Sequence, residues 1–199
     1  MKLLCVSDMV EPTLYQNFAP ERFGEVDLVI SCGDLPPEYL SFLRGAFNVP
    51  VYYVRGNHDI RYAQKPPEGC MNLHGRILRH GPLRVLGLEG SRWYNGGPIQ
   101  YTEAQMRFLV WRLRPRIWRK GGIDVVVTHA SPRHIHDTED RCHRGFSIYR
   151  KLIQWYRPRL FLHGHIHANF DDDAQRITYA GNTQVINCFG FYQVKIDEK

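Results

Sequence analysis

Side chains that bind metals or move protons follow five apolar runs of this sequence. The five polar clusters are Ser7-Asp8, Gly33-Asp34, Gly56-Asn57-His58-Asp59, Thr128-His129 and Gly164-His165-Ile166-His167. Carboxylate, amide and imidazole groups without thiolate form an oxygen and nitrogen ligand set that suits Mn²⁺, Fe or Zn²⁺. An all-oxygen set would have indicated Ca²⁺ or Mg²⁺ instead. The sequence therefore predicts a transition-metal site, and the two-residue spacing of His165 and His167 lets both side chains leave an extended strand on one face.

The apolar runs before these clusters are typical of strands that are buried on both faces, as in parallel sheets. The runs are Leu3–Val6, Leu28–Ile30, Val51–Val54, Val125–Val127 and Leu160–Leu162. Ligand sites of open α/β sheets form outside the carboxyl ends of the strands. We therefore expect the five polar clusters to meet in one crevice.

Helices are expected between these strands, over residues 38–47, 102–117 and 146–156. Thr102 and Gln105 have the spacing of a capping box. Pro115 is expected to kink or interrupt the second helix, because proline removes a backbone hydrogen bond. Residues 133–145 show no apolar periodicity and are predicted to form a loop beside His129.

The composition is that of an ordinary globular chain, with 199 residues and 43% apolar side chains. We expect one domain over residues 1–199. The apolar run before Ser7 is only four residues long, and no run of about 18 apolar residues follows, so we expect a cytoplasmic protein without a membrane partner. The five cysteines lack metal-type spacing and are expected to be free thiols, several of them buried. The formal charge of +6 favours an acidic partner.

In this order, the polar clusters resemble the motifs of the calcineurin-like metallophosphoesterase superfamily. The resemblance extends from Asp8 to His167, and its most specific parts are Gly56-Asn57-His58-Asp59 and Gly164-His165-Ile166-His167. It implies a four-layer αββα sandwich, in which two mixed sheets are flanked by helices. Periodicity alone supports only a layered α/β protein.

The resemblance also implies a role for each motif residue. Asp34 would bridge two divalent ions, expected to be Mn²⁺ with Fe, Zn²⁺ or Ni as alternatives. The ligands would be Asp8 and His167 at the first ion, and Asn57, His129 and His165 at the second. A hydroxide between the ions would attack phosphorus, and His58 would contact the phosphoryl oxygen or protonate the leaving group.

Taken singly, these residues also have structural explanations. Asp8 or Asp34 could cap a helix, Asn57 could fill a turn, and His129 could be a hydrogen-bonded core residue. Their joint occurrence after predicted strands favours metal binding.

The sequence departs from the superfamily at its first motif. The usual opening is Asp-x-His, but Val10 stands where the histidine is expected, and valine cannot bind a metal. We therefore expect the first ion to bind more weakly, with water, a substrate oxygen or Glu11 completing its ligands.

Substrate contacts are expected from the loop that follows His129. The candidates are Arg133, His136 and His143, although some of them could simply be solvated. The leading prediction is metal-dependent hydrolysis of a phosphomonoester or phosphodiester in a small soluble molecule. The oligomeric state is left open.

Two rival functions remain at this point. A nuclease or nucleotide phosphodiesterase is supported by the basic charge and by the arginines and tryptophans of residues 107–119, although a solvated basic helix explains that segment more simply. A non-catalytic protein-binding scaffold with the same fold is supported by Val10 alone.

Overall fold

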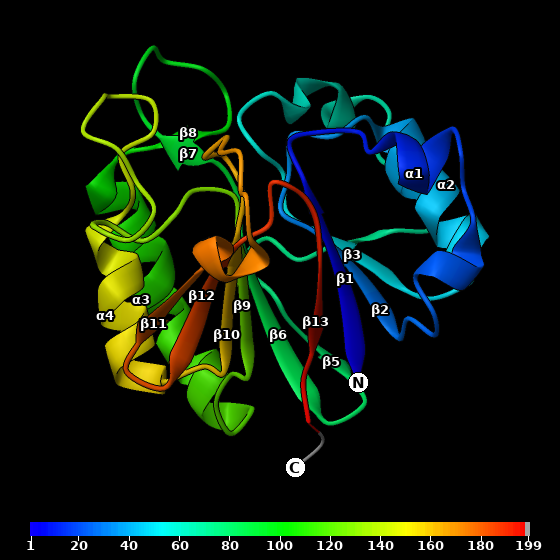
Figure 1. Cartoon of the computed structure of the whole chain (residues 1–199). Coiled ribbons are helices and arrows are strands. Elements are labelled where there is room, and N and C mark those ends of the chain that lie inside the picture. The colour runs from blue at the N-terminus through cyan, green and yellow to red at the C-terminus, as the bar shows by residue number, and fades with distance from the viewer. Residues whose placement is uncertain (198–199) are drawn as a thin grey trace.

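Two mixed β-sheets lie against each other at the centre of the molecule, and helices cover their outer faces (Figure 1). The computed structural model describes residues 1–197. The strands are β1 (Lys2–Ser7), β2 (Leu28–Ser31), β3 (Val51–Tyr53), β4 (Met71–Asn72), β5 (Ile77–His80), β6 (Leu83–Leu88), β7 (Ser91–Arg92), β8 (Gln100–Tyr101), β9 (Val125–Thr128), β10 (Leu160–His163), β11 (Ile177–Ala180), β12 (Thr183–Asn187) and β13 (Gly190–Lys195). The helices are α1 (Pro12–Tyr15), α2 (Pro37–Phe47), α3 (Glu103–Arg119) and α4 (Ser147–Tyr156), with short 3₁₀ turns η1 (Pro20–Arg22), η2 (Asp59–Ala63) and η3 (Asp173–Arg176).

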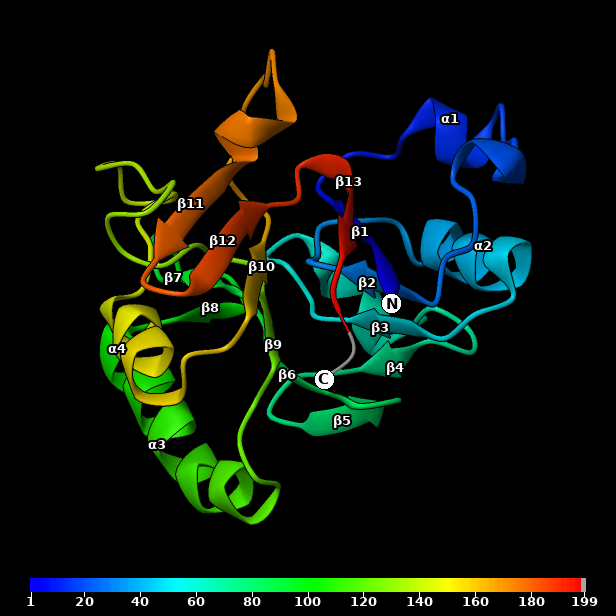
Figure 2. The same cartoon turned by 60° about the horizontal axis from the view of Figure 1, so that its bottom comes forward.

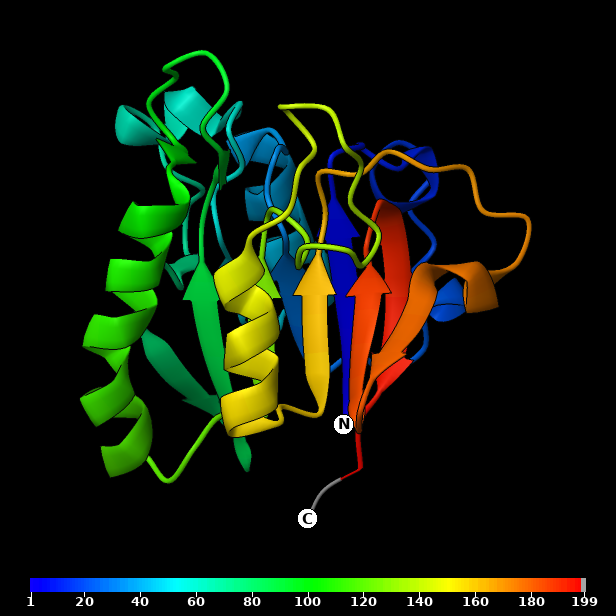
Figure 3. The same cartoon turned by 90° about the vertical axis from the view of Figure 1, so that its left-hand side faces the viewer.

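The strand order places the expected site-bearing strands next to one another. One sheet has the order β13-β1-β2-β3-β4, and the other has the order β11-β12-β10-β9-β6-β5. Strands β1, β2 and β3 are parallel in the first sheet, and β6, β9, β10 and β12 are parallel in the second. Figure 3 shows the arrows of β6, β10 and β12 in the second sheet pointing toward the same group of loops. All these carboxyl ends therefore lie at one edge of the sandwich.

Alternate side chains of each central strand enter different cores, which explains the continuous apolar runs. In β9, Val125 and Val127 pack between the sheets, whereas Val126 packs against the helices on the outer face. In β1, Leu3 faces the space between the sheets and Leu4 faces the α1–α2 side. Both faces of each sheet are covered. Polar residues at alternate positions would therefore be buried, and the strands are continuously apolar instead.

Three apolar clusters thus separate four layers of secondary structure. Helices α1 and α2 cover the first sheet, and α3 and α4 cover the second, as the rotated view in Figure 2 also shows. The predicted fold class, two mixed sheets flanked by helices, is confirmed.

Local signals in the sequence also correspond to observed elements. Thr102 caps α3, and its side chain accepts a hydrogen bond from the Gln105 amide, as the predicted capping box requires. The expected interruption at Pro115 does not occur, because α3 continues to Arg119 with the proline inside it. Ile117, beyond the proline, is fully buried, so its packing holds the last turn in place despite the missing backbone donor. No helix within residues 1–197 is long and apolar enough to cross a membrane.

Candidate metal centre

The polar clusters from five strands meet at one edge of the sandwich. Asp8, Asp34, Asn57, His129 and His165 lie just after β1, β2, β3, β9 and β10, respectively. Asp8, Asp34 and His165 have φ angles of 64°, 56° and 66°, in the left-handed region that non-glycine residues rarely adopt. Backbone strain of this kind concentrates at functional sites, where the surrounding structure maintains it.

His129 is the best-defined side chain of this group. Its ring is fully buried, and its Nδ1 lies 2.8 Å from the carbonyl oxygen of Cys32. This carbonyl can only accept, so Nδ1 carries the proton in the neutral ring and Nε2 presents a lone pair. Nε2 lies 3.1 Å from Asn57 Oδ1 and 3.2 Å from Asp34 Oδ2. Three acceptor atoms therefore converge on one point.

Asp59 fixes the loops that carry two of these acceptors. Its buried carboxylate accepts hydrogen bonds from the backbone N–H groups of Asp34 (2.8 Å), Leu35 (3.1 Å) and Gly56 (2.7 Å). Asp34 Oδ1 in turn accepts the backbone N–H of His58 at 2.8 Å. The loops after β2 and β3 are thus tied together by carboxylates, and the His58 side chain is left exposed at the opening.

Two glycines allow the loops to approach the carboxylates closely. A Cβ atom on Gly56 would collide with the Asp34 carboxylate and come within 2.7 Å of His129 Cε1. A Cβ on Gly164 would collide with the side chains of Ser7 and Asp8. The glycine of each motif is therefore required by contact with the candidate ligands.

We call Asp34, Asn57, His129 and His165 the closed half of the site, because all four are buried or nearly so. The candidate ligand atoms of Asp34, His129 and His165 all lie within 4.8 Å of one another. His165 Nε2 lies 2.9 Å from the carbonyl oxygen of Cys142, which fixes the orientation of the ring. Such contacts to the distal nitrogen are typical of metal-binding histidines.

We call Asp8 and His167 the open half. His167 Nε2 lies 3.5 Å from Asp8 Oδ1, and the His167 ring stacks on Phe189 with 4.9 Å between ring centroids. The side chain of His167 is 62% exposed, whereas that of Asp8 is fully buried. Val10 lies partly buried against the outer apolar cluster beside α1 and α2.

Glu11 was expected to be an alternative ligand at the open half, and the structure places its carboxylate against a neighbouring turn. A Cβ on Gly190 would lie 2.6 Å from Glu11 Oε1. Burial raises the pKa of Glu11 even though Arg176 opposes the shift.

The charges of the site are strongly coupled. Burial alone would raise the pKa of Asp34, but His129 and the His58 amide lower it to about 2. Burial would likewise lower the pKa of His129, but Asp34 and Asp8 raise it to about 9. Burial and the adjacent Asp34 carboxylate raise the pKa of Asp59 to about 7. Several acidic groups are therefore held together at the edge of the core, where a cation would stabilise them.

The side chains present fit a metal pair. Asp8 Oδ1 is buried and accepts no hydrogen bond, with His167 Nε2 3.5 Å away, and a bound cation would stabilise it. A second indication is the convergence of His129 Nε2, Asn57 Oδ1 and Asp34 Oδ2, which a cation could satisfy in place of the proton of a charged His129 ring. Asp8 and His167 would hold one cation, and the closed half would hold the other. Asp34 would contribute to both cations.

The three candidate substrate residues have different surroundings. Arg133 donates to Asp137 at 2.7 Å and to Glu139 at 2.8 Å, so its guanidinium holds the loop together. His136 lies between two partners, with Nδ1 2.8 Å from His163 Nε2 and Nε2 2.9 Å from Thr178 Oγ1. His143 alone is directed toward the centre, with its ring centroid 5.1 Å from that of His165.

Sequence reasoning missed several residues that support the site. Glu89, after β6, is buried and accepts hydrogen bonds from Arg55 at 2.7 and 2.8 Å and from Tyr101 at 2.8 Å. Arg55 directly precedes the Gly56-Asn57 turn, so this ion pair anchors the closed half. The position of Glu89 directly after the apolar strand β6 was the signal in the sequence that could have identified it. Cys142 was also missed, because nothing local relates it to His165.

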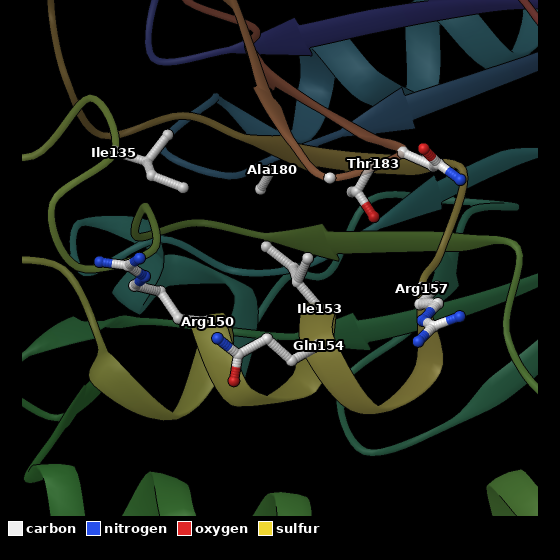
Figure 4. A pocket seen from close by; sticks show the side chains of 9 residues that line it. Ile135, Arg150, Ile153, Gln154, Arg157, Ala180 and Thr183 are labelled. Carbon is white, nitrogen blue, oxygen red and sulfur yellow. The ribbon is translucent and has the colours of Figure 1, made fainter.

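A separate pocket of about 520 Å³ lies between α4 and the β11–β12 hairpin (Figure 4). Ile153 of α4 points into it across from Ala180, and Arg150 and Arg157 lie at its sides. Among the residues 1–197 that line it there is no carboxylate or histidine. This pocket therefore lacks the ligand chemistry of the candidate metal centre.

The double-sheet sandwich with nitrogen and oxygen ligands at its strand ends defines the class of metal-dependent phosphoesterase folds. The family model of calcineurin-like phosphoesterases matches residues 1–169, and the chain belongs to this family. The resemblance stated from the motifs is thereby confirmed. The family is typically dinuclear and metal-dependent. No curated protein matches the chain.

Solved structures agree with this fold. The protein TT1561 of Thermus thermophilus is 17% identical, with a TM-score of 0.63 over 95% of this chain and 89% of that protein. The calcineurin-like phosphoesterase YfkN from Bacillus subtilis is 11% identical, with a TM-score of 0.55 over 94% of this chain and 80% of that one. GAP50, described as the anchor in the inner membrane complex of Plasmodium, is 14% identical, with a TM-score of 0.54 over 95% of this chain and 71% of that one. At these identities the likeness shows the fold alone.

Proposed function

We propose that this protein hydrolyses a phosphoester bond of a small, soluble phosphorylated molecule with two divalent cations, Mn²⁺ first among them. The observation that carries the proposal is the convergence of His129 Nε2, Asn57 Oδ1 and Asp34 Oδ2, beside the buried Asp8 Oδ1, which accepts no hydrogen bond and has His167 Nε2 3.5 Å away. A cation would satisfy these acceptor atoms together, whereas without one their contacts depend on protonation of the His129 ring.

The protein supplies a preorganised frame for the reaction. Asp59 holds three backbone N–H groups, so the Asp34 carboxylate does not need to reorient when substrate arrives. The Cys32 carbonyl fixes the ring of His129, and the Cys142 carbonyl fixes that of His165. When bound, the cations would polarise the phosphoryl oxygens and activate a water as nucleophile.

His58 is the proposed catalytic side chain. It is exposed at the opening, while its backbone N–H is bound to Asp34 Oδ1. A pocket of about 200 Å³ lies beside it, with Asp34, Pro36 and Tyr62 among its lining residues. From this place the imidazole would contact a phosphoryl oxygen or protonate the leaving oxygen as the P–O bond breaks.

The positions of two loops favour a small substrate over a polymeric one. Asn57 Nδ2 donates to the Tyr94 hydroxyl at 3.3 Å, and the carbonyl of Cys142 lies against His165. Residues 93–99 and 133–145 therefore both reach the closed half and narrow the approach to it. The basic, tryptophan-bearing last turn of α3 precedes β9 by a few residues and so lies at the opposite end of the sheet (Figure 3).

The test is hydrolysis of an aryl phosphomonoester and an aryl phosphodiester with added Mn²⁺. Asp34→Asn should lower turnover on the order of 1,000-fold, as expected when a central electrostatic group is lost. Glu25→Gln, an exposed carboxylate away from the site, is the matched control and should leave turnover unchanged. Full activity of Asp34→Asn would refute the proposal.

The same panel decides between the rival functions. Val10 favours a non-catalytic scaffold, and this interpretation replaces the proposal if Mn²⁺ binds but neither ester nor any nucleotide is hydrolysed. Binding of DNA or RNA that weakens steeply with salt would instead favour a nuclease, because phosphate contacts release counterions.

A further inference from the structure

A second group of metal-type ligands lies beside the closed half, on the loop after β9. The candidate ligand atoms of Cys142, His143 and His165 all lie within 4.8 Å of one another. None of the residues matched to the family motifs supplies a thiol, and Cys142 and His143 lie outside those motifs. The group therefore calls for an explanation of its own.

His143 is oriented as a ligand would be. Its Nδ1 lies 3.0 Å from both carboxylate oxygens of Asp140, so Nδ1 donates and Nε2 carries the lone pair. A carboxylate on the distal nitrogen is the common support of zinc-binding histidines, because it fixes the tautomer and raises the basicity of the ring. The ring centroids of His143 and His165 are 5.1 Å apart, which places His143 beside the shared histidine.

The same carboxylate positions Cys142. Asp140 Oδ1 accepts the backbone N–H groups of Cys142 at 2.9 Å and His143 at 3.0 Å. The Cys142 carbonyl lies 2.9 Å from His165 Nε2, and the Cys142 thiol interacts with Tyr94. Cys142 is partly buried, so solvent ions can reach it. Thiol and imidazole are thus held on one side of His165 by backbone hydrogen bonds.

We propose that Cys142, His143 and His165 form a site for a thiophilic divalent cation, Zn²⁺ above all, that competes with the Mn²⁺ pair for His165. Thiolate and imidazole are both ligands that Zn²⁺ takes in proteins, whereas Mn²⁺ prefers oxygen ligands. Cys142 binds as the thiolate and releases its proton to solvent. Three protein ligands leave a fourth position open to water or another group.

The proposal shares His165 with the proposed dinuclear centre but does not require phosphoesterase activity. A cation on the thiol side would engage the ring that otherwise belongs to the closed half. Zn²⁺ and Mn²⁺ would therefore differ in where they bind, and not only in how tightly.

Co²⁺ is the direct probe, because a thiolate ligand gives a charge-transfer absorption that nitrogen and oxygen ligands do not. The band should appear in the unmodified protein and persist in Cys70→Ser, the matched control, since Cys70 is the other partly buried thiol. It should vanish in Cys142→Ser. His143→Ala should weaken Co²⁺ binding at this site at least about tenfold.

Asp34→Asn separates this proposal from the phosphoesterase. Asp34 is not among the three residues, so the band should remain in that variant even where turnover is lost. Retention of the band in Cys142→Ser, or its absence from the unmodified protein at saturating Co²⁺, would overturn the proposal.

Alkylation mapping provides a second measurement that needs no variant. Zn²⁺ should protect Cys142 from iodoacetamide and leave Cys70 unprotected, as read from the modified peptides. Equal modification of Cys142 with and without Zn²⁺ would contradict the site.

Discussion

The closed and open halves of the candidate centre use similar ligand types but differ in how they are held. In the closed half, His129 and His165 each have a backbone carbonyl on one ring nitrogen, and both rings are buried. In the open half, His167 is mostly exposed and is held by a ring stack on Phe189. The difference lies in the surrounding contacts, and the loss of such contacts typically lowers metal affinity by about 10- to 100-fold.

The two halves also differ in what lies behind them. The loop of Asn57 is anchored by Asp59 and by the buried Arg55–Glu89 pair. Behind Asp8, the position that the family fills with histidine is Val10, which packs against the apolar cluster beside α1 and α2. A tight second cation and a weaker first one are therefore expected.

Removal of one histidine from each half is the strongest test of this difference. His129→Ala should lower Mn²⁺ affinity on the order of 100-fold or more, because a buried, oriented ligand is lost. His167→Ala should cost about tenfold, since its exposed ring is less fixed. Mn²⁺ titration followed by electron paramagnetic resonance measures both variants. Equal losses would show that the two halves do not differ.

Glu89→Gln tests whether the support behind the closed half matters. Breaking the pair with Arg55 should lower Mn²⁺ affinity roughly tenfold at the tight site and leave the weak site unchanged. Glu103→Gln is the matched control, because Glu103 pairs with Arg92 and the N-terminus of α4 away from the candidate ligands. It should weaken stability without changing Mn²⁺ affinity, and an equal drop in affinity in both variants would refute the anchoring role.

In the metal-free protein, the effect of Glu89→Gln on the free energy of unfolding should depend on pH. Burial alone would raise the pKa of Glu89, but Arg55 holds it below its ordinary value. A lowered pKa means that the ionised form stabilises the fold above the ordinary pKa, and that this stability is lost as pH falls through the lowered pKa. Glu89→Gln should cost roughly 1–3 kcal/mol at pH 7. In urea unfolding the gap to the unmodified protein should shrink toward pH 4, and a gap that widens there would contradict the assignment.

The closed half was more predictable from sequence than its support. Apolar runs revealed the strands because both faces are buried, and parallel strands bring their ends together, so Asp34, Asn57 and His129 could be found from order alone. Glu89 also follows an apolar strand, but nothing local relates it to its partner Arg55, and nothing local relates Cys142 to His165. For Arg133, in contrast, the position in the sequence suggested a role that the observed contacts do not support. Its position beside His129 suggested substrate binding, but its charge is directed to Asp137 and Glu139.

Val10→His should reduce the difference between the halves. A histidine at this position would add a nitrogen ligand near Asp8, and Mn²⁺ affinity at the weak site should rise by less than about tenfold, because the loop lacks the carbonyl and carboxylate contacts that orient His129. Val10→Ala is the control, since it removes the same apolar packing without adding a ligand. If both variants bind Mn²⁺ equally, residue 10 faces the apolar cluster in both. The weakness of the open half would then arise from the path of the loop after Asp8, which a single side chain cannot correct.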